Sequence, residues 1–447
     1  MPELDYIRNL LGIKLSEKII FTKEPRKLRS DGKSYMVFYA KLTHKPEVCP
    51  HCGVVREGHN IRVHDYYVSD IKMGAFISGD QARLHLSKPR FKCLSCRKTF
   101  KIENGIVKPY HQISNQLELK IFRDASLPIS ETNIAYLNHV SHATVNRKIN
   151  KTHEQRVINY EVLPEVLCFD EFKSTNNAEG AMSFIFKEHS GKVIDIVENR
   201  QLEQLKRYFR QYSRKARRGV KHIVIDIYMP YVSLIETMFP NATIVIDKFH
   251  VVQLVNRALN QTKIEAMKRH KEHHTKFKNY WRLILMNSSK LSTFKYHYSR
   301  TFQNHLTTNQ IVKEILNIDG ELKVTNDYYQ AILRAIEVKD EEKLKHLFDN
   351  PYDGISAKMQ IARRSLKKFI EPIIAALDTG YTNASLVGTI TLIKTIKRVA
   401  FGYRSFYHFR NRIMLVLDYN PIKKQREHKA KLKIKEKERL ERQKSVA

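Results

Sequence analysis

The spacing of hydrophobic and polar positions changes along the chain and divides it into segments. Residues 1–109 carry short apolar runs broken by turn residues, which predicts short strands. In residues 110–158 the apolar positions recur at helical spacing, which predicts a small helical domain. Beyond residue 250 the pattern is helical and highly charged for more than a hundred residues, until a further helical segment begins near residue 381.

Residues 159–250 alternate strand and helix signals. Their apolar stretches predict five strands, at residues 166–172, 182–189, 192–199, 222–228 and 242–249. Helical patterns separate the last three strands, at about residues 201–217 and 230–238. This order of elements predicts an α/β fold with a mixed sheet.

Size and charge narrow the class of protein. A chain of 447 residues is too long for one compact core, so we expect several domains. The net charge of +33 favours a polyanionic partner such as nucleic acid, although a well-solvated basic protein is the simpler alternative. No stretch approaches 18 apolar residues without a charge, and the N-terminus lacks the pattern of a secretory signal. We therefore expect no membrane association, a cytoplasmic protein that associates with the nucleoid, and a basic tail at residues 421–447 that attracts phosphates.

Two Cys-x-x-Cys pairs predict a zinc module. The pairs are Cys49-Pro-His-Cys52 and Cys93-Leu-Ser-Cys96, and together they supply the four thiolates of a structural zinc site. The gap of roughly forty residues is about twice the usual spacing, so a β-hairpin or two should be inserted between the pairs. Unliganded thiols are the alternative for these four cysteines. Cys168 lies in an apolar strand and is expected to be a small buried hydrophobe.

Residues 130–149 fit a helix-turn-helix. Ser130 can cap a helix whose Ile134 and Leu137 face inward, and a second helix then follows from residue 142, burying Ile149 with Ala143 or Val145. This leaves a polar set exposed that is typical of a recognition helix: Thr144, Asn146, Arg147 and Lys148. Short turns between helices also occur in ordinary cores, so packing alone is the alternative.

Three aspartates stand at the ends of apolar strands, where a charge is costly without a partner. They are Asp170, Asp226 and Asp247. In an RNase H-like sheet the first and fourth strands are neighbours, so Asp170 and Asp226 would meet as ligands for magnesium or manganese in phosphoryl transfer. Capping of helices or pairing with lysines is the alternative for each aspartate taken singly.

Several blocks of the chain resemble the L-three family of insertion-sequence transposases. The resemblance covers nearly the whole chain and is carried by Phe169-Asp-Glu171, Val224-Ile-Asp226, Met229-Pro-Tyr231, Phe239-Pro-Asn-Ala242, Asp247-Lys-Phe-His250, residues 393–398 and residues 401–406. It implies a zinc ribbon at residues 1–109, a helix-turn-helix domain at 110–158 and an RNase H-like catalytic domain of the DDE type at 159–250 and 381–420. A helical insertion at 251–380 would divide the catalytic domain.

The resemblance also implies roles for single residues. Asp170 and Asp226 resemble the first two catalytic carboxylates, and Asp247 and His250 match an auxiliary block. Basic and aromatic residues after the third carboxylate are expected to hold the DNA backbone: Lys394, Lys397, Arg398, Tyr403 and Arg410. The implied partners are double-stranded DNA, both the terminal inverted repeats of the element and the target, and further copies of the chain.

One departure from the family pattern bears on activity. The catalytic glutamate aligns with Val387, and Ile390 and Thr391 replace a pair of asparagines. A valine neither binds a metal nor accepts a proton, so we expect weak or absent strand cleavage. The alternative function is a non-catalytic DNA-binding protein, such as a repressor derived from a transposase. An RNA-directed nuclease is disfavoured because no RNA-reading aromatic motif accompanies the sheet.

Overall fold

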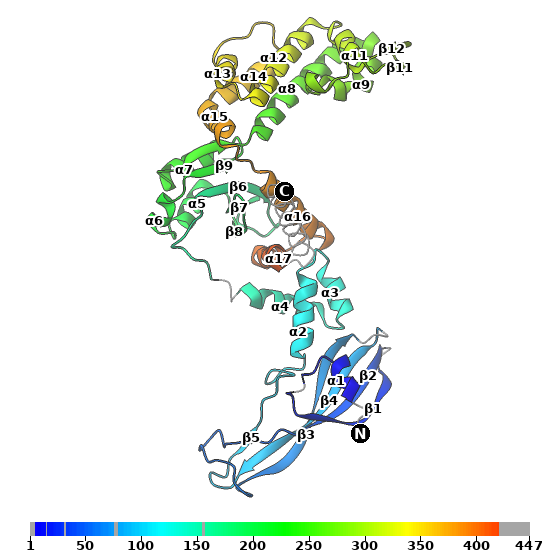
Figure 1. Ribbon diagram of the computed structural model, residues 1–447, viewed down its shortest axis with the longest axis vertical. Helices are drawn as coiled ribbons and strands as arrows, with labels where there is room; N and C mark the ends of the chain where they lie inside the picture. Colours follow the sequence, from blue (N-terminus) through cyan, green and yellow to red (C-terminus); the bar gives the residue numbers. More distant parts are fainter. Residues whose placement is uncertain (1–4, 15, 31–32, 76–78, 154–156, 420–447) are drawn as a thin grey trace, which may run out of the picture. The chain divides into compact units, whose positions relative to one another are not determined.

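The computed structural model describes residues 5–14, 16–30, 33–75, 79–153 and 157–419. The chain forms two compact units. Unit 1 contains residues 1–157 and 392–447, and unit 2 contains residues 158–391. Figure 1 labels the elements of both units. The expected basic tail at 421–447 lies outside the described residues.

Unit 1 begins with a short helix and a five-stranded sheet. These elements are α1 (Asp5–Leu10), β1 (Ile19–Ser30), β2 (Lys33–Leu42), β3 (Ile61–Ala75), β4 (Gln81–Cys93) and β5 (Thr99–Lys101). The strand order is β1-β2-β4-β3, with β5 also paired to β4; β2 and β4 run parallel, and the other pairs are antiparallel. Strands β1 to β4 have 10 to 15 residues, so the prediction of short strands is wrong here. Turn residues within β1 and β3 are accommodated by register shifts rather than by strand ends.

Four helices complete unit 1, namely α2 (Asn115–Ala125), α3 (Glu131–Leu137), α4 (His142–His153) and α17 (Phe406–Tyr419). Apolar residues of all four share one small core, to which α17 contributes Leu415. Buried Arg412 of α17 donates hydrogen bonds to the carbonyls of Leu127 and Ile129, both at 2.8 Å. The segment after residue 391 is thus grouped with the helix-turn-helix, whereas the sequence analysis assigned all of residues 381–420 to the catalytic domain. The physical reason is that α17 packs its apolar face and its buried arginine on α2–α4.

Unit 2 is built on a five-stranded mixed sheet with the order β10-β9-β6-β7-β8. The strands are β6 (Val166–Lys173), β7 (Met182–Glu188), β8 (Val193–Val197), β9 (His222–Ile225) and β10 (Thr243–Ile246). Strands β6, β7 and β8 form an antiparallel meander, while β9 and β10 run parallel to β6. Helices α5 (Leu202–Phe209), α6 (Arg214–Arg218) and α7 (Met229–Met238) connect the later strands. The five predicted strands are all present, and the first and fourth are neighbours.

A helical insertion follows β10 and returns to the sheet through α15 (Figure 1). Its longer helices are α8 (Lys248–Arg269), α11 (Thr308–Leu316), α12 (Gly320–Val338), α13 (Glu341–Asp349), α14 (Ala357–Lys367) and α15 (Ile370–Thr379). Shorter elements between α8 and α11 are η2 (Lys271–His273), α9 (His274–Asn279), α10 (Trp281–Ile284), η3 (Ser288–Lys290) and the small hairpin β11 (His297–Ser299) and β12 (Asn304–Leu306). Helix α16 (Ala384–Val399) comes next and crosses the boundary between the two units.

Sheet and insertion of unit 2 share one continuous core. Aromatic rings fill the part beside the sheet, where Phe169 of β6 contacts Phe184, Phe186, Phe209, Tyr231 and Phe239. Farther along the chain the same core contains Val255 of α8, Ile332 of α12 and Ile373 of α15. The ends of β6 and β9 and the start of α8 are therefore set by close packing around them.

Candidate functional site

The four cysteines of unit 1 come together in a geometry that suits zinc. Their sulfur atoms all lie within 4.8 Å of one another, with 3.7 Å between Cys49 and Cys96 and 3.8 Å between Cys52 and Cys93. A tetrahedral set with metal–sulfur bonds of about 2.3 Å has sulfur atoms about 3.8 Å apart. Strands β3 and β4 form the hairpin predicted between the pairs, and Ile61 pairs with Cys93 at its base. The backbone N–H of Cys96 helps to lower the pKa of Cys93 to about 6, which favours the thiolate that a metal needs.

Asp170 of the central strand β6 and Asp226, directly after the end of β9, lie at the same level of the sheet in unit 2. Strands β6 and β9 are parallel, with Cys168 paired to Val224, so Asp170 and Asp226 lie two residues beyond the same pair. The two side chains sense each other electrostatically. Burial first, and then the charge of Asp226, raises the pKa of Asp170 from 3.8 to about 7. A cation bound beside the two carboxylates would offset both the burial of Asp170 and its repulsion by Asp226.

Asp247 and His250 follow β10, which runs parallel to β9, so they lie at the same end of the strands as Asp226. His250 Nε2 lies 2.6 Å from Asp226 Oδ1. Burial alone would lower the pKa of His250, but the contact with Asp226 outweighs it and raises this pKa. Asp247 is buried and caps α8, because its Oδ1 accepts the backbone N–H of Phe249 at 2.9 Å.

Asn383 connects three of these segments, and the sequence analysis did not single it out. Its backbone N–H donates to Asp247 Oδ2 at 2.7 Å, and its side-chain amide donates to the Phe169 carbonyl at 3.2 Å and to Asp226 Oδ1 at 3.4 Å. The residue is fully buried. A polar residue directly before a helical pattern is a capping signal, which is the only sequence feature that marked it.

Val387 lies one helical turn beyond Asn383. Its backbone N–H donates to the Asn383 carbonyl at 2.9 Å, so Val387, in the first turn of α16, lies on the same face as Asn383, which directly precedes the helix. The Val387 side chain is 41% exposed, and it lines the same pocket as Asp247. Residues 379–417 contain no Asp or Glu, so this helix offers no substitute carboxylate.

The residues at this edge fit a divalent cation only in part. Asn383 Oδ1 is buried and accepts no hydrogen bond within the described part of the chain, because the amide nitrogen is turned to Phe169 and Asp226. Together with Asp170 and Asp226 it offers the hard oxygen donors that magnesium or manganese takes. Among the described residues, the only three or more His, Cys, Asp or Glu grouped closely enough to hold an ion are the four zinc-module cysteines. Val387, which the sequence analysis aligned with the third carboxylate, is apolar.

The structure corrects part of the predicted recognition helix. Val145, Ile149 and Ile134 are buried as expected, but Leu137 is 47% exposed. Arg147 is exposed, and Thr144 and Asn146 are half-buried. Lys148 was expected to be exposed, but it is buried and forms an ion pair with Glu118 at 3.0 Å, since it faces α2 rather than solvent.

The expected DNA-backbone residues of the last segment fall into two groups. Lys394 and Arg398 are exposed on α16, and Lys397 is half-buried there. Tyr403 is half-buried and stacks on Phe409, and Arg410 is buried in α17. Asn146 is also engaged by this segment, because its amide lies 3.0 Å from His408 Nε2. His408 in turn contacts Glu131 at 2.8 Å.

No helix in the described residues is both long and apolar enough to cross a membrane.

Comparisons with known proteins agree with this arrangement. A family model described as a transposase of the ISL3, or L-three, DDE type matches residues 167–413, and a model described as the zinc-finger of transposase IS204/IS1001/IS1096/IS1165 matches residues 45–96. A stretch of 250 residues, 55% of the chain, is 25% identical to the transposase for insertion sequence element IS1001 of Bordetella parapertussis and covers 59% of that protein. A stretch of 111 residues, 25% of the chain, is 35% identical to a protein of Lactococcus lactis subsp. lactis named ATP-dependent protease and covers 36% of it.

The matched stretches thus span less than two thirds of either relative. The first family model, in contrast, covers more than half of the chain, including the whole carboxylate edge and Asn383. The zinc-finger model covers all four clustered cysteines. The chain therefore belongs to the ISL3 family of DDE transposases and carries the zinc ribbon of that family.

Proposed function

We propose that the chain binds the terminal inverted repeats of its own insertion sequence and acts there on DNA by metal-dependent phosphoryl transfer, with impaired strand cleavage. The observation that carries the proposal is the pair of aspartates, Asp170 in β6 and Asp226 directly after β9, which Asn383 links to the helix that bears position 387. The net charge of +33 supports a DNA partner. By family, several copies of the chain would act on paired ends, at the nucleoid.

The chemistry follows from the donor set. Asp170 and Asp226 would hold magnesium or manganese, which lowers the barrier to attack on a phosphodiester by activating the nucleophile and stabilising the leaving oxygen. His250 would hold Asp226 in place, since its Nε2 lies 2.6 Å from Asp226 Oδ1. Asp247 uses one oxygen for Phe249 and the other for Asn383, so its role is to position the start of α8 and α16.

Impairment follows from Val387. An aliphatic side chain at the third position neither coordinates a cation nor accepts a proton. Asn383 adds a neutral oxygen but no negative charge, so the cation would be held less tightly than by three carboxylates. The same observation supports the second candidate function, a DNA-binding repressor that uses unit 1 and cuts no DNA.

The name of the Lactococcus relative refers to a different activity, that of an ATP-dependent protease. The sequence contains no Gly-x-x-x-x-Gly-Lys-Ser/Thr loop of the kind that binds ATP phosphates.

Binding to the DNA that flanks the gene tests the proposal. Duplexes from the two flanks and a scrambled duplex of equal composition are titrated with the chain at several salt concentrations. We expect tighter binding to the flanks, with an affinity that falls steeply as salt rises, and the same affinity for Asp170→Asn. Equal affinity for flank and scrambled DNA would refute recognition of the terminal repeats.

A further inference from the structure

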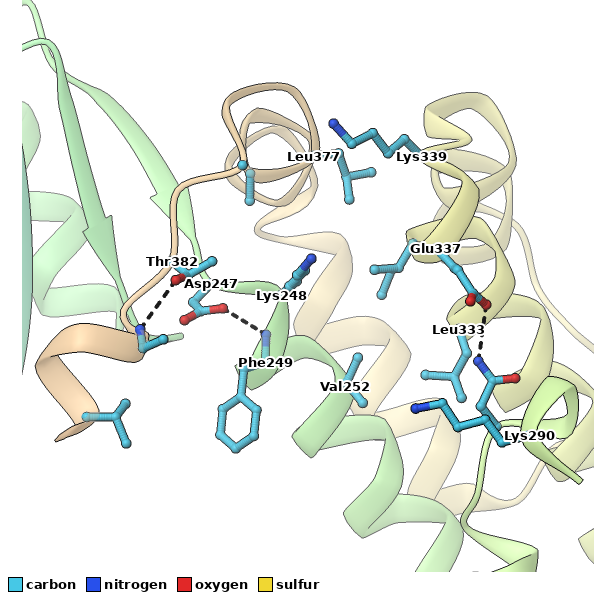
Figure 2. A pocket seen from close by; sticks show the side chains of 16 residues that line it. Asp247, Lys248, Phe249, Val252, Lys290, Leu333, Glu337, Lys339, Leu377 and Thr382 are labelled. Carbon is cyan, nitrogen blue, oxygen red and sulfur yellow. Dashed lines mark hydrogen bonds between the residues drawn. The ribbon is translucent and has the colours of Figure 1, made fainter. Parts of the chain in front are cut away.

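A pocket of about 780 Å³ lies beside the carboxylate edge, wholly within unit 2 (Figure 2). It is formed by the start of α8, the end of α12, the end of α15 and the first turn of α16. Much of its wall is apolar, supplied by Val252, Leu333, Ile336, Leu377 and Val387. This size is in the range of sites that bind small organic groups. The proposed chemistry involves only Asp247 and Val387 of this lining and leaves the rest of the pocket without a role.

The pocket adjoins the catalytic position itself. Asp247 and Val387 both line it, and Asp247 is bonded to Asn383, whose amide reaches Asp226. The residue in place of the third carboxylate is thus part of the pocket wall. The pocket therefore lies next to the place proposed above for the reacting phosphodiester.

Three lysines give the pocket a positive rim. Lys248, Lys290 and Lys339 line it, all are exposed, and none forms an ion pair within the described residues. Two carboxylates oppose them, but both are engaged: Glu337 accepts a hydrogen bond from Asn287 at 3.2 Å, and Asp247 accepts two backbone N–H groups. Unpaired ammonium groups around an apolar wall suit a ligand with a phosphate at one end and a flat apolar surface at the other.

Phe249 is the only aromatic residue in this lining. It is 56% exposed, although it follows two buried residues at the end of β10 and the buried Asp247. Figure 2 shows its ring next to Val252, at the start of α8. An exposed aromatic ring in a basic groove is the usual platform on which an unpaired base stacks.

We propose that this pocket holds an unpaired nucleotide of the DNA strand next to the reacting phosphodiester, with the base on Phe249 and its phosphates near Lys290 and Lys339. The proposal rests on the DNA substrate proposed above. It adds a binding site for a base taken out of the duplex, which requires that the strand be frayed or extruded at the site of reaction.

Binding to two duplexes of one sequence tests the pocket, without divalent cations so that no cleavage intervenes. One duplex is blunt and the other carries three unpaired thymidines at one 5′ end. We expect the unmodified chain to prefer the second, Phe249→Ala to lose about tenfold in that preference, and Phe249→Tyr to keep it. Phe294→Ala is the matched control, since Phe294 is an exposed phenylalanine of the insertion outside the pocket. Lys290→Gln should weaken binding of the overhang more than Lys358→Gln, since Lys358 is an exposed lysine of α14 outside the pocket.

Crosslinking of the unmodified chain provides a second readout that does not depend on whether a substituted chain folds. 5-Iodouracil replaces one unpaired thymine, and mass spectrometry maps the attached residue, which we expect to be Phe249. Equal affinity for both duplexes, or crosslinks only outside the pocket lining, would overturn the pocket proposal while DNA binding stands. Failure to bind either duplex would overturn the proposed DNA function as well.

Discussion

Asn383 donates its backbone N–H to the carboxylate of Asp247 at 2.7 Å, across 136 positions of the sequence. This bond joins the two helix starts that flank the helical insertion, because Asp247 precedes α8 and Asn383 precedes α16. The Asn383 side chain extends the link to Phe169 and Asp226. One buried amide thus ties β6, the end of β9 and both helix starts together.

Substitution of Asn383 tests this link. Asn383→Ala removes the side-chain hydrogen bonds and leaves the Phe169 carbonyl without its buried donor, so the free energy of unfolding should fall by about 1–3 kcal/mol. Asn383→Asp should lower the free energy of unfolding further, because a fourth acid joins Asp170, Asp226 and Asp247. Magnesium should reduce the difference in stability between the two variants, because it offsets this repulsion. Chemical denaturation with and without magnesium measures both effects. Equal stabilities for the two variants would show that the amide does not face the carboxylates.

The raised pKa of Asp170 predicts a stability that depends on pH. Asp170 binds its proton more tightly in the folded chain than in the unfolded chain. The free energy of unfolding therefore falls as pH rises from the unfolded pKa of 3.8 through the folded pKa of about 7. Asp170→Asn removes that loss, so at pH 8 in EDTA the variant should be more stable than the unmodified chain by roughly 2–4 kcal/mol, and near pH 4 by little.

Magnesium supplies the control for Asp170. It should stabilise the unmodified chain at pH 8 but not Asp170→Asn, because the amide offers a weaker ligand. Thermal unfolding across pH measures both quantities. A variant that is less stable than the unmodified chain at pH 8 without metal would contradict the burial of this charge.

The zinc module predicts that the zinc content depends on the four clustered cysteines and not on Cys168. The unmodified chain and Cys168→Ser should each contain about one zinc ion, whereas Cys93→Ser should lose most of it. Loss of the metal should speed hydrogen exchange in β3 and β4, whose ends it fastens together. Elemental analysis and hydrogen exchange provide the two readouts. Full zinc content in Cys93→Ser would rule out the four-thiolate site.

The strands of the sheet and its two strand-end aspartates could be predicted from the sequence, because they are marked by local patterns. Apolar stretches marked all five strands of unit 2, and two aspartates at strand ends predicted a shared edge once β6 and β9 were neighbours. The cysteine spacing likewise predicted the hairpin between the zinc knuckles.

Contacts between segments that are distant in the sequence could not be predicted in this way. Nothing local to Asn383 shows that its amide reaches Phe169, and nothing in α17 shows that Arg412 is buried among the helices of unit 1. Lys148 looked like a surface lysine because its partner, Glu118, lies 30 positions earlier. Polar residues buried by long-range partners cannot be told from solvated ones by pattern alone.

The neighbours Arg147 and Lys148 offer a matched test of the helix-turn-helix. Arg147 is exposed, so Arg147→Ala should weaken DNA binding and reduce the slope of log affinity against log salt by about one. Lys148 pairs with Glu118, so Lys148→Ala should lower the stability of unit 1 by about 1–3 kcal/mol and leave the salt slope unchanged. Fluorescence anisotropy over a salt series, with a thermal melt for each variant, separates the two effects. A smaller salt slope for Lys148→Ala than for Arg147→Ala would reverse the assignment.

Cleavage by Val387→Glu tests the central claim most directly. Magnesium-dependent nicking of a duplex from the flanking DNA is compared between the unmodified chain, Val387→Glu and the neutral control Val387→Gln. The account predicts little or no nicking by the unmodified chain and by Val387→Gln, and a rate at least about 100-fold higher for Val387→Glu, because a third carboxylate completes the cation site. Rapid nicking by the unmodified chain, or no gain from the glutamate, would contradict it.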